Sequence, residues 1–211
     1  MTDKKIIITA LILAILLVGA GWYYSKYNPQ TAAILPKTSP SPTGPAVTTA
    51  GITIGNPSAP IIMEEYTNFL CSHCINFATK TLPQIEDEYV KTGKVKLVIY
   101  VFPPMEFGKA ALCAVEQNKF LEMHNYFFAH QVRKEEDFID FAINAGLDGK
   151  AFGECFSSDK YNNISQKWYD EGIARGITGT PTFYINGRQM VGAQPFGEFQ
   201  KVIEEKMANI K

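Results

Sequence analysis

Two cysteines at the junction between a predicted strand and a predicted helix constrain this chain more than any other feature. The motif Cys71-Ser72-His73-Cys74 follows an apolar run, residues 61–70, and opens a segment with helical periodicity, residues 75–90. Cysteines at this spacing form and break a disulfide with little backbone movement, and the unpaired amides at a helix start favour a thiolate. The sequence therefore predicts that Cys71 is the attacking sulfur and that Cys74 resolves the mixed disulfide.

His73 lies between the two cysteines. A protonated or hydrogen-bonded imidazole there would stabilise the Cys71 thiolate and make the disulfide a stronger oxidant. A C-x-x-C motif is also half of a zinc site, but structural zinc takes four ligands, and the other cysteines and histidines form no second pair. We expect no metal and no cofactor; a copper or zinc carrier using Cys71, His73 and Cys74 stays as an alternative of another class.

The amino terminus has the pattern of a membrane anchor. Residues 6–24 carry no charge and would span about 28 Å as a helix, close to the thickness of a bilayer's hydrocarbon core. Two lysines precede this run and three aromatic residues close it, which predicts a cytoplasmic segment at residues 1–5 and an exported remainder. Small residues at 19–21 leave a cleaved signal peptide as the alternative, although the long apolar run favours an uncleaved anchor.

The segment after the anchor predicts a spacer. Residues 25–50 contain five prolines among threonine, serine and alanine, a composition that cannot build a core. The net charge of −1 gives no reason to expect a nucleic-acid partner. Export also changes the meaning of the cysteines, because disulfides persist outside the cytoplasm, where an oxidising role becomes plausible.

Residues 51–211 predict one folded domain of the α/β class. A strand at 61–69, a helix at 75–90 and a strand at 96–102 indicate a parallel crossover. Residues from about 105 to 176 show only helical periodicity, which predicts an inserted helical block. A hairpin around Asn186-Gly187 and a last helix at 195–207 complete a mixed sheet flanked by helices.

Three separated features resemble a known family. The segment from Glu65 to Cys74, the helical block and the run from Gly179 to Phe183 are together similar to the DsbA-like thiol:disulfide oxidoreductases of the thioredoxin superfamily. The resemblance covers about residues 52–208 and implies a thioredoxin fold with an inserted all-helical subdomain. Many relatives have Pro-His between the cysteines, so Ser72 departs from that pattern and puts the redox potential in doubt.

The resemblance also implies roles for residues outside the motif. Pro181 takes the place of the family's cis-proline, which would leave the backbone of Thr180 free to pair with an extended substrate. Glu65 fits the buried acid six residues before the nucleophile and would relay the proton of Cys74, with Glu64 facing solvent.

Cys113 and Cys155 lie in the helical block. Some relatives carry a structural disulfide in this region, and an exported domain favours such a bond between Cys113 and Cys155. Two buried free thiols are the alternative.

The leading hypothesis is a membrane-tethered, extracytoplasmic dithiol oxidase that introduces disulfides into exported proteins, in the periplasm or at the cell exterior. By resemblance, a quinone-linked membrane partner, DsbB-like or similar to vitamin-K-epoxide reductase, would reoxidise it. A reductase or isomerase of the same fold, with electrons flowing the other way, is the alternative; isomerases usually add a dimerisation domain, whereas this chain has a linker.

Overall fold

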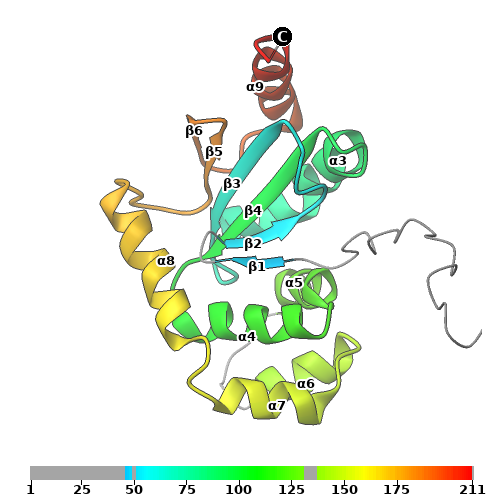
Figure 1. Cartoon of the computed structure of the whole chain (residues 1–211), viewed down its shortest axis with the longest axis vertical. Helices are drawn as coiled ribbons and strands as arrows, with labels where there is room; N and C mark the ends of the chain where they lie inside the picture. Colours follow the sequence, from blue (N-terminus) through cyan, green and yellow to red (C-terminus); the bar gives the residue numbers. More distant parts are fainter. Residues whose placement is uncertain (1–45, 49–50, 131–136, 211) are drawn as a thin grey trace, which may run out of the picture. The chain divides into compact units, whose positions relative to one another are not determined.

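The computed structural model describes residues 46–48, 51–130 and 137–210. Six strands in these residues form one sheet with the order β1-β2-β4-β3-β5-β6 (Figure 1). In chain order the strands are β1 (Ala46–Thr48), β2 (Gly51–Ile54), β3 (Ile61–Thr67), β4 (Val95–Val101), β5 (Thr182–Ile185) and β6 (Arg188–Val191). The pairing of β3 with β4 is parallel and the other pairings are antiparallel, which confirms the predicted mixed sheet.

The predicted anchor, residues 6–24, lies outside the described residues. None of the helices that the structure describes is long and apolar enough to cross a bilayer.

The crossover from β3 to β4 is helical from Ser72 to Val90 but is not one regular helix. It consists of α2 (Ser72–Asn76), η2 (Phe77–Thr81), α3 (Leu82–Ile85) and η3 (Glu86–Val90), of which η2 and η3 are π-helical turns. Pro83 explains the first irregularity, because it has no backbone N–H to donate to the preceding turn. The helix begins at Ser72, three residues before the periodic segment at 75–90, so the cysteine motif lies at the helix start, as the sequence indicated.

Aromatic side chains bind helices to both faces of the sheet. On one face the Tyr66 ring stacks on Tyr100 at 4.6 Å between centroids, and Tyr100 meets Trp168 of α8 (Asn162–Ala174) edge to face. On the other face Phe77 of the crossover and Phe199 of α9 (Phe196–Ala208) contact Phe183 on β5. The sheet is therefore covered on both sides, as buried parallel strands require.

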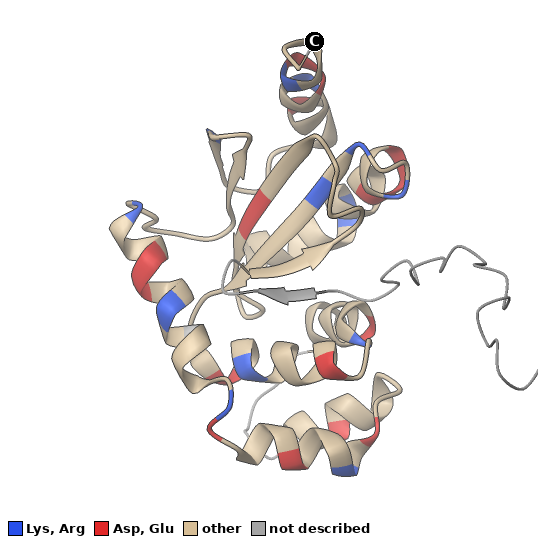
Figure 2. Cartoon of the chain, viewed as in Figure 1, with Lys and Arg blue, Asp and Glu red and all other residues tan. Residues whose placement is uncertain are grey.

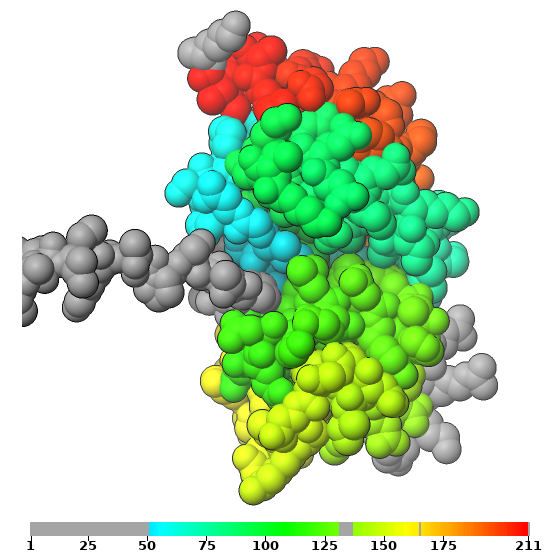
Figure 3. Space-filling view, turned by 90° about the vertical axis from the view of Figure 1, so that its right-hand side faces the viewer, coloured from blue at the N-terminus to red at the C-terminus, as the bar shows by residue number. Residues whose placement is uncertain are grey.

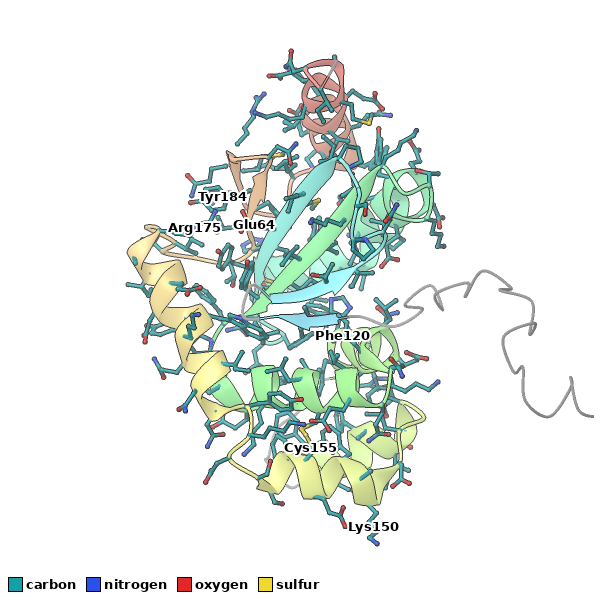
Figure 4. The ribbon with its side chains drawn as sticks, viewed as in Figure 1. Glu64, Phe120, Lys150, Cys155, Arg175 and Tyr184 are labelled. Atoms are coloured by element: carbon teal, nitrogen blue, oxygen red, sulfur yellow. A yellow bond between two sulfur atoms is a disulfide. The ribbon has the colours of Figure 1, made fainter. Side chains whose placement is uncertain are left out.

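The helices between β4 and β5 form the predicted inserted block. Before α8 they are α4 (Met105–Glu116), α5 (Phe120–Ala129), α6 (Asp137–Asn144) and α7 (Gly149–Ser157). Phenylalanine rings from α4, α5 and α6 meet in its interior, and Figure 3 shows this green-to-yellow block packed directly against the cyan-to-teal part of the chain. Cys113 on α4 and Cys155 on α7 are joined by a disulfide (Figure 4).

An ion pair holds the carboxyl end of α8 to the sheet. Arg175 donates from Nη1 and Nη2 to the two carboxylate oxygens of Glu64, at 2.8 and 3.0 Å, and its guanidinium lies 4.1 Å from the Tyr184 ring centroid (Figure 4). Glu64 was expected to face solvent; its side chain is only 22% exposed and is paired with Arg175, far along the chain. Elsewhere on α8 and on α9, residues of both charge signs occur side by side (Figure 2).

The two edges of the sheet differ in how well the sequence predicted them: β1 was missed, and the β5–β6 hairpin was predicted. The predicted linker ran to residue 50, but the structure places Ala46–Thr48 in β1, paired with β2. A three-residue edge strand is held by main-chain hydrogen bonds, so its side chains give little signal. The predicted hairpin is confirmed: Asn186 and Gly187, with φ of 42° and 83°, turn the chain from β5 into β6.

The disulfide should stabilise the folded chain. Its cysteines are 42 residues apart, which corresponds to about 4 kcal/mol at most in the chain-entropy model. In a Cys71→Ser/Cys74→Ser background, where Cys113–Cys155 is the reducible bond, we expect dithiothreitol to lower the free energy of unfolding, measured by urea titration. An unchanged unfolding midpoint, with reduction verified by mass spectrometry, would contradict this.

Candidate functional site: a dithiol at a helix start

The two cysteines of the motif occupy different surroundings. Cys71 is the extended residue that precedes α2, with φ −83° and ψ 122°, and its sulfur is partly exposed. Its backbone is fixed on both sides, because its N–H donates to the Asn68 carbonyl at 3.0 Å and its own carbonyl accepts from Ile75 N–H at 3.0 Å. Cys74, one turn into the helix, is 0% exposed, and both residues are free thiols in the structure.

The surroundings of Cys71 favour its thiolate. Burial alone would raise the pKa of Cys71, but the nearby backbone of Cys74, the side chains of Thr180 and Cys74 and the backbone of His73 outweigh it and lower the pKa. His73 therefore acts on Cys71 through its main chain here, and its side chain is exposed. The predicted role of the imidazole stays a prediction.

Cys74 has the opposite character. Burial raises the pKa of the Cys74 thiol to about 12, even though the neighbouring side chains of Thr180 and Thr67 and the Asn68 backbone lower it. The Asn68 backbone N–H donates to Cys74 Sγ at 3.5 Å. A sulfur with such a pKa leaves a disulfide far more easily when a proton is supplied to it.

The loop before β5 brings the Thr180–Pro181 peptide to the Cys71 sulfur. The Thr180–Pro181 peptide is cis, as the resemblance implied, and the Cys71 thiol donates to the Thr180 carbonyl at 3.2 Å. Pro181 is buried, and its own carbonyl accepts from Gly192 N–H at 2.8 Å, which ties this loop to the residue after β6. The Cys71 sulfur and the Thr180 carbonyl are therefore in contact, although the two residues are 109 positions apart in the sequence.

Glu65 is buried and unpaired. It is 0% exposed, and neither carboxyl oxygen has a hydrogen-bond partner among the described residues. Burial raises its pKa to about 8, an effect that Thr67 opposes and the Glu86 carboxylate increases. Glu65 is therefore mostly protonated at neutral pH and can supply a proton inside the protein.

Three further residues of the site were not singled out from the sequence. Thr67 follows Glu65 on the same face of β3. Asn68 accepts from Leu70 N–H at 2.7 Å and donates from Nδ2 to the Pro103 carbonyl, in a loop whose Pro103–Pro104 peptide is also cis. An asparagine just before a helix is a known turn signal, whereas nothing in the sequence predicts the contact with Pro103.

The described residues contain no group of three or more His, Cys, Asp and Glu side chains placed to hold a metal ion. The motif itself presents two thiols of different reactivity beside a proline loop.

A sheet of this order, with a reactive thiol at the start of the crossover helix and a cis-proline beside it, defines a protein of the thioredoxin fold with a dithiol site. The chain belongs to the thioredoxin family, since the sequence profile described as "Thioredoxin" matches residues 47–205. The crystal structure of Chlamydia trachomatis DsbA has the same fold, with a TM-score of 0.68 at 20% identity, covering 79% of this chain and 96% of that one.

Two relatives by sequence have very different lengths. The "Probable disulfide bond formation protein D" of Bacillus anthracis is 24% identical over 169 residues, which cover 73% of this chain and 77% of that protein. The "Na(+)/H(+) antiporter NhaA 3" of Salinispora tropica is 28% identical over 146 residues, 65% of this chain but only 22% of the antiporter. The second similarity thus concerns a part of a much longer protein.

The buried carboxyl of Glu65 should make stability depend on pH. Because its pKa is raised from 4.5 to about 8 in the folded chain, the folded state holds this proton more tightly, and stability falls as pH rises between these values. We expect Glu65→Gln to remove this part of the decline in the free energy of unfolding, measured with urea from pH 5 to 8. The exposed Glu88→Gln serves as the control, and a Glu65→Gln curve parallel to wild type would contradict the assignment.

Proposed function

We propose that this protein is an extracytoplasmic thiol–disulfide oxidoreductase whose Cys71–Cys74 disulfide oxidises pairs of thiols in exported proteins. The observation that carries the proposal is the difference between the two sulfurs: Cys71 is accessible with a lowered pKa, and Cys74 is buried with a raised one. Stabilising the Cys71 thiolate stabilises the reduced protein relative to its disulfide, and this makes the disulfide the stronger oxidant.

In the first step a substrate thiolate attacks Cys71 Sγ of the disulfide. A bond forms between the substrate sulfur and Cys71, the Cys71–Cys74 bond breaks, and Cys74 leaves with the electron pair. Glu65 supplies the proton that converts the leaving sulfur to a thiol, since the carboxyl is mostly protonated at neutral pH. Burial of Cys74 directs the attack to Cys71.

In the second step the other thiolate of the substrate attacks the substrate sulfur of the mixed disulfide. Cys71 leaves as a thiolate, which the backbone hydrogen bonds at the helix start stabilise. Two electrons have then passed from the substrate dithiol to the cysteine pair. The loop at Thr180 and Pro181 borders the sulfur throughout and is the surface on which an extended substrate backbone would lie.

The location and the partners belong to the same proposal. The uncharged run at residues 6–24, with lysines before it, supports an anchor that places the domain outside the cytoplasm. A dithiol produced in each cycle must be reoxidised, and a quinone-linked membrane protein of the DsbB-like or vitamin-K-epoxide-reductase-like kind would do so. The name of the Bacillus relative, a disulfide bond formation protein, agrees with the oxidising direction.

Redox equilibrium with glutathione tests the direction of electron flow. In the full chain, followed by alkylation of Cys71, we expect the cysteine pair to stay reduced even in relatively oxidising glutathione buffers, because the Cys71 thiolate is stabilised. A pair that stays oxidised until the buffer is strongly reducing would contradict the oxidase and favour the reductase.

Single cysteine variants test the roles of the two sulfurs. With glutathione disulfide at neutral pH, we expect Cys74→Ser to form a mixed disulfide at Cys71 rapidly, because the attacking thiol has a lowered pKa. Cys71→Ser should react at least about tenfold more slowly through the buried Cys74, whose thiolate fraction is far smaller. Mass spectrometry follows both adducts, and equal rates would show that the two thiols are not distinguished.

A further inference from the structure

We propose that the Thr67 hydroxyl carries the proton between the Glu65 carboxyl and the Cys74 sulfur. This inference rests on the proposed function, since it concerns how the buried leaving sulfur obtains its proton. Sequence patterns single out Glu65 and Cys74 but give Thr67 no part in the chemistry.

The backbone places Thr67 between the two groups. Glu65 and Thr67 are two residues apart on β3, so their side chains emerge on the same face of the sheet about 7 Å apart. Cys74 Sγ lies 3.5 Å from the backbone nitrogen of Asn68, the atom bonded directly to the Thr67 carbonyl carbon. The Cys74 sulfur is therefore beside Thr67, the last residue of β3. Glu65 lies two residues earlier on the same strand and the same face.

Glu65, Thr67 and Cys74 form the proposed proton path, and the carboxyl and hydroxyl groups of this path are buried without hydrogen-bond partners among the described residues. Glu65, Thr67 and Cys74 are each 0% exposed. Both Glu65 oxygens and Thr67 Oγ1 lack a hydrogen-bond partner within the described residues, although groups of this kind are nearly always paired when buried. A hydroxyl with no competing bond is free to turn toward either neighbour, and Thr67 lowers the pKa of both Glu65 and Cys74.

The relay conserves protons and charge. As Cys74 leaves the disulfide with its electron pair, the Thr67 hydroxyl proton passes to Cys74 Sγ, and the Glu65 carboxyl proton passes to Thr67 Oγ1. The result is a neutral Cys74 thiol, an intact Thr67 hydroxyl and a Glu65 carboxylate. Oxidation of the dithiol reverses the same transfers.

Few other titratable groups change the pKa of Glu65 or of Cys74. The neighbours of Glu65 in register on β4 and β5 are Ile99 and Phe183, which do not titrate. From the crossover helix, the Glu86 carboxylate raises the pKa of Glu65, and the Cys71 thiolate raises that of Cys74. Both favour holding the proton on the buried groups.

The test measures reduction of the Cys71–Cys74 disulfide by dithiothreitol in the full chain from pH 6 to 9, with each rate divided by the thiolate fraction of the reagent. Alkylation and mass spectrometry of the Cys71 peptide exclude any contribution from Cys113–Cys155. The variants are Thr67→Val, which has the same shape without the hydroxyl, Thr67→Ser, which keeps a hydroxyl, Glu65→Gln, and the Glu65→Gln/Thr67→Val pair. Urea unfolding checks that each is folded.

For wild type and Thr67→Ser we expect the corrected rate to fall as the pH passes about 8, where Glu65 loses its proton. Thr67→Val and Glu65→Gln should both be about a hundredfold slower at pH 7, at the low end of general acid–base effects, and should lack this fall. The double variant should be no slower than either single one, because the two residues act in one path.

A Thr67→Val variant with the wild-type pH profile would overturn the relay, as would a Thr67→Ser variant that behaves like Thr67→Val, or single effects that multiply in the double variant. A Glu65→Gln variant that keeps the fall near pH 8 would remove Glu65 and hence the relay, while exchange at Cys71 continued. A wild-type disulfide inert to dithiothreitol would instead contradict the proposed function itself.

Discussion

The start of the crossover helix imposes opposite conditions on two sulfurs that are only three residues apart. Cys71 lies just before the helix, where the backbone of His73 and Cys74 favours its thiolate and solvent has access, whereas Cys74 lies one turn in and is fully buried. A dithiol in two equal environments would have no preferred attacking atom. Under the proposed function, the helix start therefore makes Cys71 the attacked and attacking atom and leaves Cys74 in need of a proton from within the protein.

Both conditions depend on segments from distant parts of the chain. The Thr180 carbonyl approaches Cys71 because β5 pairs with β3, and Asn68 holds the motif to the Pro103 loop that leads into the helical block. The sheet order places these loops at the same end of β3 as the motif. Each loop ends at a cis-proline peptide, at Pro104 and at Pro181.

Local patterns in the sequence were sufficient for most of the fold and for part of the site. The cysteine spacing, the Asn186-Gly187 turn and the helical periodicity of the block each act within a few residues, and the structure agrees with them. The partner of Glu64 and the contact of Asn68 with Pro103 could not be found in this way, because they join residues brought together only by folding. The π-helical turns near Pro83 depend on local detail that periodicity averages out.

The second cysteine pair, Cys113 and Cys155, has surroundings that differ from those of Cys71 and Cys74. Cys113 is 0% exposed, so a thiolate there would lose its hydration, and Cys155 Sγ lies 3.6 Å from Oε1 of Glu116, a carboxylate that disfavours a negative charge on this sulfur and is itself paired with Lys160 at 2.7 Å. Around Cys71, by contrast, the neighbouring groups lower the pKa and favour the thiolate. Because exchange requires a thiolate to attack and another to leave, these surroundings favour exchange at the helix start over exchange at the bond in the helical block.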